Sequence, residues 1–171
     1  MEVYFDGQGY AQKDEIAQVR KYHKNPNMWD YFLRTRIAVD SLEDLLDEKE
    51  GNLDKVQMLF ADMEEREEAW KELEREGVFE LVGSLQYNIE INAVGVNKGT
   101  GLVNLGKMLG IRREEIMACG DGDNDIAMLK EVGFGVAMAN AEEKVKAVAD
   151  YITESNNDEG VAKAIEKFVL K

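Results

Sequence analysis

The 171-residue sequence contains only one cysteine, one proline and one histidine. The single cysteine, Cys119, excludes an intrachain disulfide, so a reducing compartment is the simplest setting. No run of residues is apolar enough to span a bilayer, and the amino terminus lacks the basic and apolar regions of a secretion signal. We therefore expect a soluble, cytoplasmic protein that has no membrane as a partner.

Positive charge is also scarce, because 21 Lys and Arg residues stand against 35 Asp and Glu residues and leave a net charge of −14. Proteins bind the phosphates of nucleic acids through Lys and Arg patches, so the composition argues against a nucleic acid as partner. The acidic residues are densest between residues 43 and 80, where a solvated helix face is the simplest interpretation. A hydrophobic content of 44% can still supply the core of one large or two small domains.

A dense acidic loop is the most informative feature that is present. Residues 120–125 follow the apolar run 116–119, which predicts a buried strand, and they precede an apolar-periodic stretch, which predicts a helix. The loop carries Asp121, Asp123 and Asp125. Open α/β sheets bind ligands at the carboxyl ends of their strands, and Mg²⁺ takes carboxylate oxygens as ligands. The loop is therefore a candidate for half of a Mg²⁺ site.

Other interpretations of this loop have to be weighed. Asp, Asn and Gly favour turns and helix N-caps, so the loop could be purely structural. An EF-hand calcium site does not fit, since its sixth residue should be Gly and is Ile126, and its twelfth should be Glu and is Val132. Phosphoryl transfer with Mg²⁺ is the remaining catalytic interpretation, and it requires a fixed positive charge beside the metal.

Lys98 is the candidate for that positive charge. It precedes Leu102, Leu105 and Leu109, whose spacing predicts a helix with one apolar face. A solvated surface lysine is the alternative interpretation. The surrounding glycines match neither G-x-G-x-x-G nor G-x-x-x-x-G-K-[ST], so by themselves they are weak evidence for a phosphate-binding loop.

Five short segments between residue 85 and the carboxyl end follow one another in an informative order. They are residues 89–91, 95–99, 120–125, 135–141 and 158–162. In type and order these segments resemble the landmarks of the haloacid dehalogenase-like (HAD) phosphatases, specifically the Cof-type subfamily with a large inserted cap. The resemblance covers the whole carboxyl-terminal half of the chain.

The resemblance implies roles for individual residues. Lys98 matches the lysine that steadies the nucleophile and the transferring phosphoryl group, Asp121 matches the metal-binding acid, and Asp125 matches the acid that supports the metal shell. Asn124 matches a polar position near the phosphate, whereas Asp123 matches a variable position and is not assigned as a ligand. The family also implies Mg²⁺ as cofactor and a small phosphorylated metabolite, such as a sugar phosphate, as substrate.

The sequence departs from the family in its amino-terminal half. The family's nucleophile lies in an Asp-x-Asp-Gly-Thr-like motif, whose second Asp acts as acid and base, and neither this motif nor the Ser/Thr motif that follows it is present. The nearest segment, residues 4–9, holds only Asp6. We therefore expect a truncated chain with the cap and the carboxyl-terminal half of the catalytic core, without phosphatase turnover of its own. A non-catalytic binding or regulatory module and a phosphomutase of the same superfamily are the alternatives.

Two physical consequences follow if half of the core is missing. The carboxylates of Asp121 and Asp125 should repel each other when no metal ion neutralises their charge. The remaining sheet should also have an uncovered apolar edge, and such edges recruit other chains. We therefore expect self-association or low stability.

The expected fold is α/β, with an α+β cap over residues 1–92 and a partial HAD-like Rossmannoid core over residues 93–171. In the cap, the pattern predicts a strand at 2–5, a turn at 7–9, a helix at 13–24 and a helix capped by Ser41. In the second part, strands and helices alternate, which predicts a parallel sheet covered by helices. The strands expected there are 116–119, 134–138 and 151–153. One helix is expected to begin at Lys98, and three more are expected over residues 125–130, 142–149 and 160–170.

Overall fold

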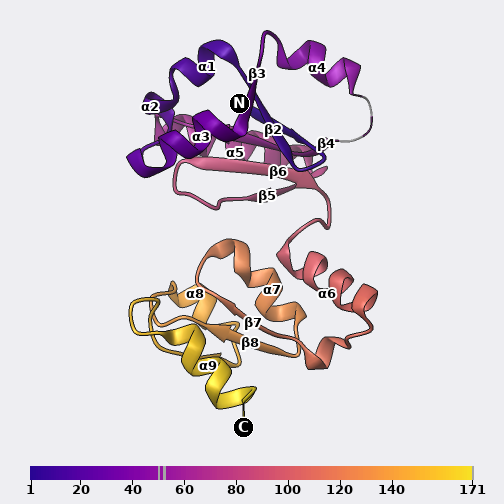
Figure 1. Cartoon of the computed structure of the whole chain (residues 1–171), viewed down its shortest axis with the longest axis vertical. Helices are drawn as coiled ribbons and strands as arrows, with labels where there is room; N and C mark the ends of the chain where they lie inside the picture. Colours follow the sequence, from indigo (N-terminus) through magenta and orange to yellow (C-terminus); the bar gives the residue numbers. More distant parts are fainter. Residues whose placement is uncertain (50, 52, 171) are drawn as a thin grey trace. The chain divides into compact units, whose positions relative to one another are not determined.

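The computed structural model describes residues 1–49, 51 and 53–170. The chain divides into two compact units, Met1–Val94 and Gly95–Lys171 (Figure 1). The sequence places a boundary between residues 92 and 96, and the assignment of the two units as cap and core stays a prediction. Within the described residues, no helix combines the length and the apolar composition needed to cross a membrane.

The first unit is built on a sheet with the strand order β3-β2-β1-β4-β6-β5. Neighbouring strands are antiparallel, except that β2 and β3 are parallel. The strands are β1 (Glu2–Phe5), β2 (Gln8–Gln12), β3 (Arg36–Val39), β4 (Leu53–Leu59), β5 (Phe79–Val82) and β6 (Asn88–Ala93). The helices are α1 (Lys13–Ala17), α2 (Val19–Tyr22), α3 (Trp29–Thr35), α4 (Leu42–Glu48) and α5 (Met63–Glu76), with the 3-10 turn η1 (Pro26–Met28) before α3.

Apolar residues cover both faces of this sheet. Successive side chains of a strand point to opposite faces, so Val3 and Phe5 of β1 share one face, where they pack against Leu42 of α4. The other face carries Ala11 of β2, which packs with Phe32 of α3. Helices therefore cover the sheet from both sides.

Local differences from the expected elements have simple causes. The turn after β1 lies at Asp6 and Gly7, with φ of 50° and 76°, so β2 already begins at Gln8. The helix expected over 13–24 is interrupted at Gln18, whose φ of −101° and ψ of 12° are not helical. Helix α3 was not expected from the sequence. The Ser41 cap is confirmed, because its hydroxyl oxygen accepts a hydrogen bond from the backbone N–H of Asp44 at 3.1 Å.

The second unit confirms the α/β fold class, since it contains a parallel sheet with helices packed on it. The strand order is β7-β8-β9, and both pairs are parallel. The strands are β7 (Met117–Gly120), β8 (Phe134–Ala137) and β9 (Tyr151–Ile152). The helices are α6 (Lys98–Leu109), α7 (Ile126–Glu131), α8 (Glu143–Lys146) and α9 (Gly160–Phe168), with 3-10 turns η2 (Arg113–Glu115) and η3 (Asp123–Asp125).

Strand β8 shows how this second sheet is covered. On one face, Ala137 packs with Leu129 of α7 and Val145 of α8. On the other face, the ring of Phe134 lies 4.7 Å, centroid to centroid, from that of Phe168 on α9. The small buried strand therefore has helices on both faces, as expected for parallel sheets, and the carboxyl end of its neighbour β7 leads into the acidic loop.

Candidate functional site

The acidic loop after β7 is organised by the buried carboxylate of Asp125. This residue is 6% exposed, and its Oδ2 accepts hydrogen bonds from the backbone N–H groups of Asp121, at 2.9 Å, and Gly122, at 3.1 Å. Gly120 makes room for it, because a Cβ at this position would come within 2.5 Å of the Asp125 Cβ. The side chain therefore folds the chain back on itself and fixes the loop directly after the strand.

Lys98 reaches the same carboxylate from another helix. It is the first residue of α6, and Asn97 caps that helix by accepting a hydrogen bond from the Gly99 N–H at 2.9 Å. Helix α6 packs against α7, which follows the acidic loop. The Lys98 Nζ lies 2.6 Å from the Asp125 Oδ1, so two residues that are 27 positions apart form an ion pair.

This pairing changes the charge balance that the sequence predicts. Burial alone would raise the pKa of Asp125, but the hydrogen bonds from Lys98 and from the loop amides outweigh it and lower the pKa. Asp125 is thus stabilised as an anion by groups of the protein itself. The expected repulsion between Asp121 and Asp125 is therefore offset by the positive charge of Lys98. The negative charge of Asp125 in turn offsets the unfavourable interaction of Lys98 with the dipole of its own helix.

Asp121 is exposed and is held by a residue that the sequence did not single out. Its Oδ2 accepts a hydrogen bond from the side-chain amide of Asn140 at 2.9 Å. The Asn140 Oδ1 in turn accepts from the backbone N–H of Asn156 at 3.0 Å. The only signal for Asn140 in the sequence was its place in the run 135–141. Among the described residues, Asp121 Oδ2 has a partner and Oδ1 has none.

The two remaining polar residues of the loop lie differently. Asp123 pairs with Lys144, and since their side chains are 47% and 53% exposed, this is a solvated surface contact. Asn124 is half-buried in η3, and its predicted position near a phosphate stays a prediction. Cys119 on β7 is half-buried, and burial raises the pKa of its thiol, which makes it a poor nucleophile.

The donor set can be compared with what Mg²⁺ requires. Among the described residues, no three His, Cys, Asp or Glu side chains lie close enough together to hold a metal ion. Mg²⁺ is, however, often bound through one or two carboxylates, with water and substrate phosphates as the other ligands. The exposed Asp121 carboxylate, with one oxygen without a partner in the described part of the chain, fits one such ligand. Asp125 has both oxygens engaged and fits a supporting role better.

The sequence of the chain also matches the model of a known protein family. The model of the haloacid dehalogenase-like hydrolases matches residues 3–165. The chain belongs to this family. The resemblance to Cof-type HAD hydrolases is thereby confirmed, and it extends through both units of the chain.

Related HAD proteins carry phosphatase names. Over 105 residues the chain is 50% identical to 5-amino-6-(5-phospho-D-ribitylamino)uracil phosphatase YcsE of Bacillus subtilis, a match that covers 61% of the chain and 42% of that protein. Over 81 residues it is 41% identical to a phosphoglycolate phosphatase of Methanosarcina acetivorans, covering 47% of the chain and 36% of that protein. The matches thus span less than half of these two relatives.

Solved structures of HAD hydrolases resemble the whole chain. A haloacid dehalogenase-like hydrolase from B. subtilis has a TM-score of 0.77 at 28% identity, covering 98% of the chain and 64% of that structure. A HAD subclass IIB sugar phosphatase, BT4131, has a TM-score of 0.72 at 25% identity, covering 99% of the chain and 61% of that structure. In both cases the chain spans less than two thirds of the solved structure.

Proposed function

We propose that this chain is part of a Mg²⁺-dependent phosphatase that acts on a small phosphorylated metabolite, such as a sugar phosphate. The observation that carries the proposal is the Lys98–Asp125 ion pair, which fixes a cationic group at the acidic loop that presents Asp121. The names of the phosphatase relatives support the same reaction class. Cytoplasmic localisation is part of the proposal, and the single cysteine of the sequence supports it.

Each residue has a physical task in this proposal. The Lys98 ammonium offsets negative charge on the phosphoryl oxygens, which is the kind of electrostatic stabilisation that dominates phosphoryl transfer. Asp125 positions that ammonium and the loop through its three hydrogen bonds. Asp121 holds the metal, and Asn124 lies near the phosphate. Mg²⁺, when bound, neutralises phosphoryl oxygens as a Lewis acid.

We also propose that these 171 residues do not turn over substrate alone. The covalent route of the family needs an Asp nucleophile, and no Asp-x-Asp-Gly-Thr motif stands in the sequence. Self-association through the sheet of the second unit belongs to the same proposal, and sedimentation velocity would test it. A non-catalytic binding module is the second candidate, favoured by the same missing motif, and a phosphomutase is a third.

The decisive test is the reading frame around the gene for this chain. We expect an in-frame Asp-x-Asp-Gly-Thr motif upstream, and a longer protein that hydrolyses phosphate esters when Mg²⁺ is added. In that protein, Lys98→Ala and Asp121→Ala should each lower kcat by about 10²–10³, the usual effect of losing one electrostatic contact. Lys130→Ala, an exposed lysine on α7, is the matched control and should leave kcat unchanged.

The results of these experiments distinguish the phosphatase from the binding module. A frame without the motif would favour the binding module. Mg²⁺-dependent hydrolysis of p-nitrophenyl phosphate by the 171-residue chain itself would show that the proposed inactivity is wrong. Equal losses for Lys98→Ala and Lys130→Ala would contradict the role of Lys98.

A further inference from the structure

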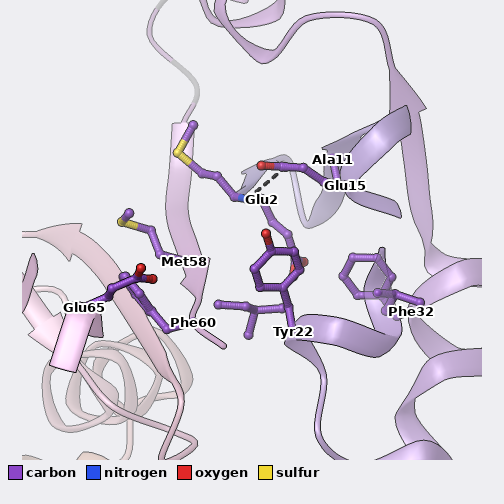
Figure 2. Close-up of a pocket in the computed structure, with 11 residues that line it drawn as sticks. Glu2, Ala11, Glu15, Tyr22, Phe32, Met58, Phe60 and Glu65 are labelled. Carbon is purple, nitrogen blue, oxygen red and sulfur yellow. Dashed lines mark hydrogen bonds and ion pairs between the residues drawn. The ribbon is translucent and has the colours of Figure 1, made fainter. Parts of the chain in front are cut away.

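Carboxylates of this protein are held by two kinds of partner. At a cavity of about 280 Å³ in the first unit, the Glu15 carboxylate is paired with the Met1 amino group, 2.8 Å away (dashed line in Figure 2). Asp121 in the second unit accepts instead from the neutral side-chain amide of Asn140, at 2.9 Å. A cationic partner neutralises a carboxylate, whereas an amide directs it and leaves its charge unchanged.

The acidic loop shows the same contrast among neighbouring residues. Asp123 pairs with Lys144, and Asp125 pairs with Lys98, so both of these carboxylates have a cationic partner. Asp121 has no cationic partner in the described part of the chain, and its Oδ1 has no donor there. Of the three carboxylates, Asp121 is therefore the one whose charge remains available to a cation from outside the chain.

The amide of Asn140 is oriented from both ends. Its Nδ2 donates to Asp121 Oδ2, and its Oδ1 accepts from the backbone N–H of Asn156 at 3.0 Å. A carboxylate requires a donor and an N–H group requires an acceptor, so the amide cannot turn over without losing both bonds. Because Asn140 Oδ1 is engaged by the chain itself, Asn140 fits a support for Asp121 better than a second ligand of the metal.

The backbone around Asn140 is fixed by the sheet below it. Strands β7, β8 and β9 are parallel neighbours, so the loops that follow them meet at one edge. The Met138 N–H donates to the Gly120 carbonyl oxygen at 3.0 Å. The Ala139 N–H donates to the Glu154 carbonyl oxygen at 3.3 Å. The loop after β8 is thus tied to the loops on both of its sides, and the Asn140 side chain starts from a fixed position.

We propose that Asn140 is a positioning residue, which aims the Oδ1 atom of Asp121 at the metal ion and links that carboxylate to the loop after β9. The inference rests on the proposed function, because it takes Asp121 as the metal ligand. An exposed carboxylate without a partner samples several rotamers, and a partner that fixes one of them removes this cost from metal binding. Such partners change metal affinity by about 10–100-fold, and the exposure of both residues places Asn140 near the lower end.

The test uses Mn²⁺ as the probe, because it shares the oxygen ligands of Mg²⁺ and its unpaired electrons broaden nearby NMR signals. In the full 171-residue chain, we expect Mn²⁺ to broaden the backbone amide signals of Asp121 and Gly122 in a saturable way. Asn140→Ala should raise the Mn²⁺ concentration needed by about tenfold. The matched control is Asn157→Ala, an exposed asparagine whose side chain makes no hydrogen bond within the described residues, and it should leave this concentration unchanged.

A double-mutant cycle separates positioning from a general loss of structure. If Asn140 acts only through Asp121, Asn140→Ala should have no further effect once Asp121→Asn has removed the carboxylate. The amide proton of Asn156 gives a readout without metal, since Asn140→Ala removes its acceptor and should speed its hydrogen exchange. If Asn140→Ala unfolds the second unit, Asn140→Ser, which keeps a polar group on a shorter side chain, takes its place.

The outcomes distinguish this inference from the proposed function. Equal Mn²⁺ binding by the unaltered chain and by Asn140→Ala would overturn the inference and leave the proposed function standing. A further loss of binding in the doubly substituted chain would also overturn it, because Asn140 would then act by a route other than Asp121. No broadening at Asp121 in the unaltered chain would contradict its role as a ligand and overturn the inference, whereas hydrolysis by the longer protein still tests the proposed function separately.

Discussion

Replacement of Asp125 by Ala should destabilise the second unit much more than replacement of Asp123, although both belong to the same acidic loop. Asp125→Ala removes the acceptor for two backbone N–H groups and for Lys98. Hydrogen bonds to a charged group contribute about 1.5–3 kcal/mol each, and the half-exposed Lys98 recovers water, so we expect a loss of about 2–4 kcal/mol. Asp123→Ala breaks only a surface ion pair and should cost about 0–1 kcal/mol.

The assay has to separate the two units. The chain has two tryptophans, Trp29 and Trp70, and both lie in the first unit, so their fluorescence is an internal reference. Hydrogen exchange measured by mass spectrometry on peptides from residues 117–141 reports the second unit. In a domain of this size, each kcal/mol shifts Tm by about 4–8 °C, so Asp125→Ala should lower the melting of the second unit by at least about 8 °C.

The outcome also has a pH signature. The pKa of Asp125 is lowered in the folded state, so its contribution to stability is present above the unfolded pKa of about 3.9 and is lost as the pH falls through the folded value. The difference between the unaltered chain and Asp125→Ala should therefore be full at pH 6 and should shrink below about pH 3.9. Equal destabilisation by Asp123→Ala, or a change confined to tryptophan fluorescence, would refute the reasoning.

Two further predictions concern buried positions. His23 is 5% exposed, and its Nδ1 lies 3.0 Å from the Tyr87 hydroxyl. Burial lowers the pKa of His23 in the folded state, so the neutral ring is favoured there. The first unit should therefore lose stability as the pH falls from about 6.5, the pKa of an unfolded histidine, toward the lower pKa of the folded state. His23→Phe should flatten this dependence in a tryptophan-monitored urea titration. Gly160→Ala should destabilise the second unit by several kcal/mol, on the order of an overpacked core, because its Cβ would lie 2.0 Å from the Glu154 carbonyl oxygen. Circular dichroism melts should show this loss, whereas Gly101→Ala, with open space around its Cβ, should not.

The second unit was largely predictable because its signals are local. The apolar run before residue 120 predicts β7, and the periodicity after Lys98 predicts α6. Parallel strands place their carboxyl ends at one edge, so an acidic loop at that edge follows from the pattern. The contact between Lys98 and Asp125 did not follow, since it depends on the packing of α6 against α7.

The first unit was less predictable because its polar residues depend on distant partners. His23 directly follows α2, but its burial depends on Tyr87, 64 residues away. Glu2 lies in a segment that reads as a simple strand, and its partner Arg36 comes from β3 on another part of the chain. Strand β2 was missed in part because Gly9 and Ala11 are small and give little strand signal.

Two carboxylates of the acidic loop, one buried and one exposed, differ in how their oxygens are engaged. Asp125 has both oxygens engaged by Lys98 and by loop amides, so its charge is already neutralised and its task is to hold the loop. Asp121 has one oxygen bound and, within the described residues, one without a donor. In the proposed phosphatase, the exposed Asp121 is therefore the carboxylate that would meet a hydrated metal ion. The engagement of both oxygens by donors of the protein thus separates the proposed supporting residue from the proposed metal ligand.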